Sequence, residues 1–143
     1  MKTEIKFYDT LPSEAKALRE EVFMLELGFS YDADEIDSTA THIVVYNDSL
    51  AVAVCRVFEG DSFGEYILGR LAVKKEHRNK GLGGVTVNAA IEYTAKSGGS
   101  SLVLHSQLSA KAFYEKLGFI PYGEIEYEED CPHIWMRKAI QTI

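Results

Sequence analysis

The segment Arg70-Leu-Ala-Val-Lys-Lys-Glu-His-Arg-Asn-Lys-Gly-Leu-Gly-Gly84 joins an apolar strand to a glycine-rich turn. Residues 66–73 predict the strand, and the apolar spacing after residue 84 predicts a helix. The first N–H groups of a helix have no acceptor within it, and the helix dipole favours an anion at that end. Glycine lets the backbone approach a ligand closely and adopt positive φ. The segment therefore predicts a pyrophosphate-binding turn.

Spacing separates the kinds of glycine loop that bind phosphates. A P-loop places its lysine after the second glycine, whereas Lys80 precedes the glycines here. A dinucleotide fingerprint requires a third glycine where this chain has Thr86. The pattern that fits is Arg-x-x-Gly-x-Gly, formed by Arg78, Gly81 and Gly83. The alternative is an ordinary tight connection between a strand and a helix.

Length and composition predict one globular domain that spans residues 1–143. Apolar residues make up 46% and charged residues 26% of the chain, as in ordinary soluble proteins. The net charge of −7 argues against nucleic acid as a partner. The apolar runs are too short to cross a membrane, and the first residues lack a secretory signal. With only Cys55 and Cys131 and no disulfide framework, we expect a reduced, cytoplasmic protein.

The chain before the turn predicts an antiparallel meander. Pro12 suits the start of a helix, and apolar residues then recur at helical spacing, including Leu18, Val22 and Leu25. β-branched runs on either side of Asn47-Asp48-Ser49 predict a hairpin. The expected elements are a strand at Thr3–Tyr8, a helix from Pro12 to Leu27, an acidic irregular segment at Tyr31–Thr39, and strands at Thr41–Tyr46, Leu50–Phe58 and Phe63–Val73.

After the turn, helices and strands alternate. A helix at Leu82–Lys96 leads to a strand at Ser101–His105, which should run parallel to the strand before the turn. Ser109 is the expected N-cap of a helix that ends at Leu117, with Gly118 as its terminal glycine. Two further strands, Phe119–Glu128 and His133–Ala139, complete an α/β (α+β) fold. Its sheet should have six or seven strands, be antiparallel in its first half and contain one parallel pair.

Two motifs in this order resemble the GNAT superfamily of acyl-CoA N-acyltransferases. One is Arg-x-x-Gly-x-Gly, and the other is the aromatic helix Ala110-Lys-Ala-Phe-Tyr-Glu-Lys-Leu-Gly-Phe119. Asp34-Glu-Ile-Asp37, Thr41-His-Ile-Val-Val45 and Pro132-His-Ile-Trp-Met-Arg137 are similar to the small bacterial ElaA-like branch, whose substrates are largely undefined. The resemblance implies helices on both faces of the sheet and a parallel pair that splays apart at the acyl-CoA site.

The resemblance also implies how acetyl-CoA is held as a co-substrate. His42, His77 and His105 show no metal-ligand spacing, so we expect no metal. The pantetheine arm would pair with the backbone before the turn, much like an added strand. The pyrophosphate would rest on N–H groups of the turn, and an N–H near Val73 would polarise the thioester carbonyl. The implied cofactor-binding residues are Leu71, Ala72, Val73, Arg78, Asn79, Lys80, Gly81, Leu82, Gly83, Gly84 and Phe113.

In this superfamily the amine attacks the thioester directly in a ternary complex, so no enzyme nucleophile is needed. Tyr114 matches the tyrosine that protonates the departing thiolate in many relatives. A tyrosine pKa of about 10 lies close enough to that of a thiol, about 8.5, for this transfer. The general base stays open, because Gly69 lies where some relatives carry a glutamate. His133 is the leading candidate, and Glu65 or an ordered water are the alternatives.

Three charged residues are candidates for binding the substrate. Glu35 would neutralise an ammonium group. Arg56 and Arg70 lie in apolar strands and therefore need partners, either within the protein or in a substrate carboxylate. The leading hypothesis is an acetyl-CoA-dependent N-acetyltransferase that acts on a small-molecule or peptide amine. The alternatives are a non-catalytic acyl-CoA-binding or sensing domain and an unrelated nucleotide-binding domain. An exposed edge strand is compatible with a homodimer.

Overall fold

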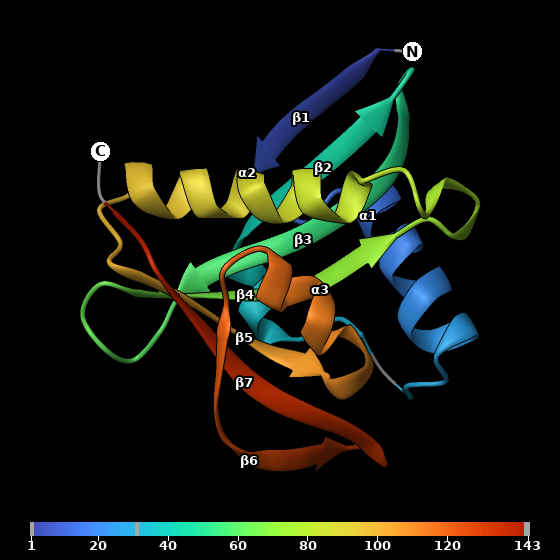
Figure 1. Cartoon of the computed structure of the whole chain (residues 1–143). Coiled ribbons are helices and arrows are strands. Elements are labelled where there is room, and N and C mark those ends of the chain that lie inside the picture. Colours follow the sequence, from blue (N-terminus) through green and yellow to red (C-terminus); the bar gives the residue numbers. More distant parts are fainter. Residues whose placement is uncertain (1, 31, 142–143) are drawn as a thin grey trace. The chain divides into compact units, whose positions relative to one another are not determined.

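The computed structural model describes residues 2–30 and 32–141, so Tyr31 of the predicted acidic segment lies outside the described residues. Seven strands form one mixed sheet in the order β1-β2-β3-β4-β5-β7-β6 (Figure 1). The chain divides into two compact units. One consists of residues 1–58 and 70–90, and the other of residues 59–69 and 91–143. Strand β4 belongs to both units.

The first unit contains an antiparallel meander, as predicted. Strand β1 (Thr3–Tyr8) pairs with β2 (Thr41–Asn47), which pairs with β3 (Leu50–Glu59). Asn47 belongs to the strand, because the hairpin turn consists of Asp48 and Ser49 alone. Both turn residues have positive φ, 49° and 72°, as a two-residue hairpin of matching twist requires.

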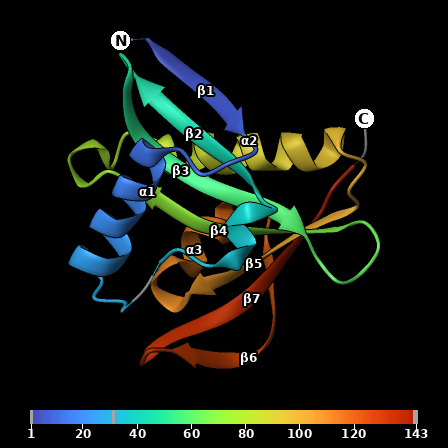
Figure 2. The ribbon, with the colours of Figure 1, turned by 180° about the vertical axis from the view of Figure 1, so that it is seen from behind.

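Helices cover both faces of this meander (Figures 1 and 2). On one face α1 (Ser13–Arg19) packs its apolar side against alternate residues of the strands. On the other face the first turn of α2 (Leu82–Lys96) packs against their neighbours. The buried cluster beneath α1 contains Ala15, Leu18, Val22, Val44, Tyr46, Ala51, Val54 and Ala72. The cluster beneath α2 contains Val45, Val52, Ala53 and Leu82. This packing places the first turn of α2 against the meander.

The predicted helix from Pro12 to Leu27 is wrong in its second half. Residues Glu20–Glu26 form a π-helix, η1, with a backbone hydrogen bond of 3.0 Å from Leu27 N–H to Val22 O. A π-turn holds more residues than an α-turn, so it rotates later side chains off the predicted packing face. Leu25, which was expected in the packed stripe, is 84% exposed.

Short elements connect the first unit. The acidic segment forms a 3₁₀-helix, η2 (Glu35–Ser38), capped by the Asp34 side chain. Strand β4 (Glu65–Val73) is followed by a second 3₁₀-helix, η3 (Lys75–His77), before α2. The bounds of α2 confirm the prediction from the sequence.

The second unit is organised around β5 (Ser101–Gln107). Residues Glu65–Leu68 of β4 pair with it in parallel, and β7 (Cys131–Ala139) pairs with it antiparallel along its whole length. Strand β6 (Ile120–Glu128) lies at the edge and pairs with β7. The β6–β7 turn is Glu129-Asp130, both with positive φ, so Cys131 and Pro132 begin β7 instead of forming the predicted loop.

Helix α3 (Lys111–Lys116) follows β5 through a 3₁₀-turn, η4 (Leu108–Ala110). The prediction of Ser109 as N-cap is wrong, because this turn places Ala110 there. Gly118 ends the helix as predicted, with φ of 94° and an N–H bond to Glu115 O. Among the described residues, no helix is long and apolar enough to span a membrane.

Candidate active site

The glycine turn has the backbone geometry of an anion cradle. Asn79 and Gly81 have positive φ, 63° and 78°, and α2 begins at Leu82. The N–H of Val85 bonds to Gly81 O at 3.1 Å, so Gly81 caps the helix. The N–H groups of the next three residues, up to Gly84, therefore have no acceptor within α2. They lie at the positive end of a 15-residue helix.

Two glycines of this turn face open space. A Cβ added at Gly81 or Gly84 would meet no atom within 4 Å among the residues that the structure describes. At Gly81 the positive φ independently favours glycine. Helical N–H groups without an acceptor in their own helix, beside glycines with no described atom close to their Cβ positions, suit the diphosphate of an acyl-CoA.

The Arg78 side chain connects the glycine turn to neighbouring elements of the protein. Its guanidinium donates to both carboxylate oxygens of Glu26, at 2.6 and 2.7 Å, and to Val73 O at 3.0 Å. The hydrogen bond from Arg78 holds the pKa of Glu26 below its usual range, and that with Glu26 raises the pKa of Arg78. The sequence suggested Arg78 as a cation beside the phosphate, whereas this side chain ties the turn to η1 and to the end of β4. Lys80 is exposed beside the glycines.

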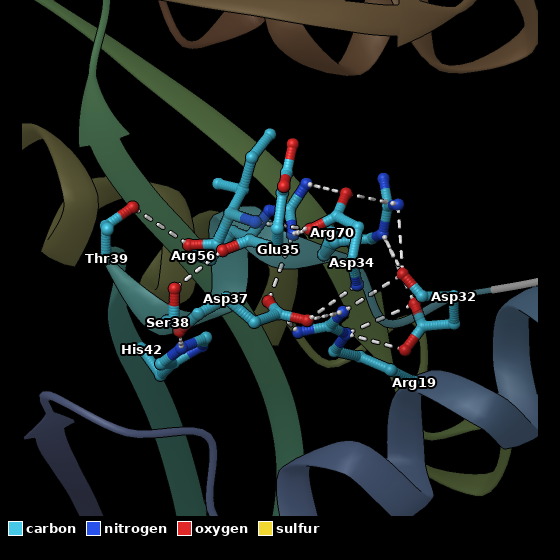
Figure 3. Close-up of polar contacts among 11 residues, drawn as sticks. Arg19, Asp32, Asp34, Glu35, Asp37, Ser38, Thr39, His42, Arg56 and Arg70 are labelled. Atoms are coloured by element: carbon cyan, nitrogen blue, oxygen red, sulfur yellow. Dashed lines mark hydrogen bonds and ion pairs between the residues drawn. The ribbon is translucent and has the colours of Figure 1, made fainter.

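The unit that contains the glycine turn also contains a largely buried group of charged side chains (Figure 3). We call it the arginine–aspartate cluster, and its members are Arg19, Arg56, Arg70, Asp32, Asp34 and Asp37. The Arg19 side chain is fully buried. Its Nε lies 3.0 Å from Asp32 Oδ2, and its two terminal nitrogens donate to the carboxylate of Asp37 at 2.9 and 3.0 Å. The segment before η2 is therefore fixed to α1.

Arg56 and Arg70 pair with aspartates of the chain itself. Arg56 donates to both Asp34 oxygens, at 2.6 and 3.0 Å, and to Asp37 at 3.0 Å. Burial raises the pKa of Asp37, but the hydrogen bonds and charges of the arginines outweigh it and hold that pKa well below its usual range. Glu35, the third substrate candidate, is exposed on η2.

Arg19 was not predicted from the sequence as a residue of this cluster. An arginine on an amphipathic helix is normally solvated, and nothing in the helical spacing marks this one as buried. The sequence did contain one signal that a buried cluster of charges exists: two arginines in apolar strands and an acidic segment without a known partner. Arg56 and Arg70 needed partners, and the acidic segment that contains Asp34 and Asp37 supplied them.

In the second unit, Tyr114 lies on α3, directly after the end of β5. Its side chain is buried and packs edge-on against Phe113 and Phe119, with ring centroids 5.0 and 5.8 Å away. Because the connection through η4 is short, α3 begins near the carboxyl-terminal end of β5. Phe113, expected beside the cofactor, contacts the Tyr114 ring.

His133 belongs to a second polar group at this end of β5. Its Nδ1 lies 2.9 Å from Cys131 O, and a carbonyl only accepts, so Nδ1 carries a proton. Its Nε2 faces Glu128 Oε2 at 3.4 Å, and the same oxygen lies 2.8 Å from His105 Nδ1. The two imidazole rings are 4.9 Å apart. We call His105, Glu126, Glu128 and His133 the histidine–glutamate cluster; its pairing depends on strand register and was not predicted.

Strand register separates two candidates for the general base. Glu65 pairs with Ser101 at the start of β5, whereas His133 pairs with Gln107 at its end. At about 3.3 Å per residue these positions are roughly 20 Å apart. Glu65 and His133 therefore cannot act at the same reacting centre. Tyr114 follows β5 in the chain, after the end of β5 where Gln107 pairs with His133 of β7.

A strand, a glycine turn and a helix N-terminus suited to a diphosphate are features of proteins that bind nucleotide-linked cofactors. Comparison with protein families makes the class specific, because residues 19–140 match the model described as the acetyltransferase (GNAT) domain. This chain belongs to the GNAT family of N-acetyltransferases. Enzymes of this family transfer an acyl group from acyl-CoA to an amine, and the predicted α/β fold with its single parallel pair is confirmed.

Known proteins support the assignment over nearly the whole chain. The uncharacterized N-acetyltransferase YjcF of Bacillus subtilis is 33% identical over 141 residues, which cover 96% of this chain and 99% of YjcF. Protein ElaA of Escherichia coli is 30% identical over 87% of this chain and 86% of its own length, which confirms the resemblance to that branch. The crystal structure of an acyl-CoA N-acyltransferase from Pseudomonas aeruginosa has a TM-score of 0.82 and 26% identity, and covers 97% of this chain and 100% of that one.

Proposed function

We propose that this chain transfers the acetyl group of acetyl-CoA to the primary amine of a small molecule or peptide, by direct attack in a ternary complex. The observation that carries the proposal is the glycine turn, where Asn79 and Gly81 have positive φ before a long helix. The backbone N–H groups from Asn79 to Gly84 bind the diphosphate, and Lys80 adds positive charge. The backbone of Leu71–Val73 pairs with the pantetheine arm.

The thioester carbonyl needs a donor as negative charge develops on its oxygen. We assign this role to a backbone N–H near Val73, since a preorganised donor gains most from charge that appears only in the transition state. Arg56 and Arg70 are assigned to the arginine–aspartate cluster instead of to substrate, because their guanidinium groups are already hydrogen-bonded. Glu35 stays a candidate for contact with a cationic part of the amine.

Proton transfers at the two ends of the reaction need an acid and a base. After the ammonium group has lost one proton, its nitrogen forms a bond to the carbonyl carbon, the carbon–sulfur bond breaks, and the thiolate takes the proton of the Tyr114 hydroxyl. The nitrogen then gives its second proton to water, and water returns a proton to the Tyr114 phenolate. His133 accepts the proton that the ammonium group loses. Its Nδ1–H bond to Cys131 leaves the lone pair on Nε2, and Glu128, 3.4 Å away, stabilises the resulting imidazolium.

Thermal unfolding with and without acetyl-CoA tests the cradle. At a hundred times Kd the ligand should add about 2.7 kcal/mol. For a chain of this size this corresponds to a rise in Tm of about 5–10 °C. NAD and ATP serve as controls. A rise with either of them and none with acetyl-CoA would contradict the proposal.

An amine screen that detects free CoA thiol then tests catalysis. Polyamines, amino acids, aminosugars and peptides cover the main classes of acceptor. Release of thiol that depends on the amine would support the transferase. Binding of acetyl-CoA without turnover on any class would favour the sensing domain, for which Gly69 in place of a strand acid is the only support.

A further inference from the structure

We propose that Arg70 is a positioning residue: its side chain, held by Asp32 and Asp34, keeps β4 in a left-handed conformation that orients Leu71–Val73 for the thioester. The inference rests on the proposed function, because it concerns the same stretch of β4. It differs from that proposal in assigning the shape of the stretch to a side-chain clamp from the segment before η2.

The backbone at Arg70 is unusual for a strand. Its φ is +53°, whereas extended strands have φ near −120° to −140°. Residues with a Cβ rarely adopt this region, and when they do the surrounding structure holds them there. The regular parallel pairing of β4 with β5 runs only from Glu65 to Leu68, two residues earlier. The departure from regular geometry thus falls directly before Leu71–Val73.

The side chain of Arg70 is anchored at the other end. Its Nε and Nη2 donate to the backbone carbonyl of Asp32 at 3.1 and 3.0 Å, and Nη2 also donates to Asp34 Oδ2 at 3.3 Å (Figure 3). The planar guanidinium spans both acceptors, which a single ammonium group cannot reproduce. Asp32 and Asp34 are themselves hydrogen-bonded by Arg19 and Arg56, so other side chains hold the residues that anchor Arg70.

The location is electrostatically unfavourable for a third arginine. Burial and the nearby charge of Arg56 lower the pKa of Arg70, although Asp32 and Asp34 oppose them. Arg19 and Arg56 already bind all three aspartates of the cluster. Arg70 is the member of the cluster that connects it to β4, so its distinct contribution is to the strand.

A change of φ at Arg70 reorients the peptide planes that directly follow it. If the clamp were lost, a residue with a Cβ would relax towards negative φ, and the N–H groups of Leu71–Val73 would turn with it. Glycine would not relax in this way, because it occupies positive φ about as readily as negative φ. This difference separates the backbone role from the loss of charge.

The experiment compares Arg70→Ala with Arg70→Gly, which remove the same guanidinium. We expect kcat of Arg70→Ala to fall about tenfold or more, since misplacing reacting groups by an ångström can cost about a hundredfold. Arg70→Gly should retain a kcat several times higher than Arg70→Ala, although glycine is the more flexible residue. Equal kcat values for folded Ala and Gly variants would overturn the inference, because a role in charge balance alone affects both equally.

Arg70→Lys decides the matter if the first two variants do not fold. It keeps the charge and the Cβ but cannot span Asp32 O and Asp34. A folded Arg70→Lys with lowered kcat would support the clamp, and one with wild-type kcat would overturn it. Failure of the wild type to bind acetyl-CoA or acetylate any amine would instead refute the proposed function, so the two failures are distinguishable.

Discussion

Replacement of Asp37 by asparagine should destabilise the protein strongly without changing the shape of the residue. The Asp37 carboxylate accepts hydrogen bonds of 2.9 and 3.0 Å from Arg19 and of 3.0 Å from Arg56. Both arginines are buried, with side-chain exposures of 0% and 4%. Removal of one partner from a buried ion pair costs about 3–5 kcal/mol, because the remaining charge is left uncompensated. For this chain length, that loss lowers Tm by roughly 6–20 °C.

Urea denaturation followed by circular dichroism measures this loss. Glu35→Gln is the matched control, because it neutralises an exposed carboxylate in the same short helix and should change stability by less than about 0.5 kcal/mol. If Asp37→Asn unfolded within about 1 kcal/mol of the wild type, the description of the cluster as buried and paired would be refuted.

The pH dependence of the same pair follows from the lowered pKa of Asp37. A carboxyl whose folded pKa lies below its unfolded value of 3.8 stabilises the protein above that value, and this stability is lost as pH falls further. The stability difference between wild type and Asp37→Asn should therefore be constant above about pH 5 and shrink as pH falls below about 4. Denaturation curves between pH 7 and pH 2.5 measure it, and a difference that grows on acidification would contradict the sign.

Three further substitutions test the candidate active site. Gly84→Ala should stabilise α2 by about 0.5–1 kcal/mol, because the added Cβ meets no described atom within 4 Å. The same substitution should weaken acetyl-CoA binding, measured by calorimetry. Unchanged affinity would count against diphosphate binding at this turn. Tyr114→Phe should lower kcat by a factor on the order of 10²–10⁴ with little change in acetyl-CoA affinity, and wild-type turnover would remove the acid assignment. Glu128→Gln should lower kcat and leave the acetyl-CoA Kd unchanged, because Glu128 stabilises the imidazolium of His133. Equal activity of this variant and the wild type would show that Glu128 does not assist His133 as the base.

Local patterns predicted the parts of the fold that local forces determine. The bounds of α2 follow from its glycine start and apolar stripe, and the end of α3 follows from Gly118, whose φ of 94° suits glycine. The π-helix was missed because the apolar spacing of a short amphipathic segment does not reveal an extra residue per turn. Leu25 keeps the helical period in sequence and is nevertheless exposed.

In the candidate site too, features set by local sequence were predictable and features set by contacts distant in sequence were not. The backbone geometry of the glycine turn was predictable because its glycines, its positive φ values and its helix start lie within one short stretch. The left-handed conformation of Arg70 was not, since its cause is a carbonyl at Asp32, far away in sequence. The contact between His105 and Glu128 depends on a register shift in β6 between Tyr122 and Glu126, which no local pattern encodes.

Exposed glutamates on the edge strand of the second unit disfavour pairing of this strand with a second copy. Strand β6 lies at the edge of the sheet and exposes Glu124, Glu126 and Glu128. Two copies that met along this strand would bring rows of like charges face to face, which disfavours an extended intermolecular ladder. Edge-to-edge association between copies along β6 is thus disfavoured by charge repulsion.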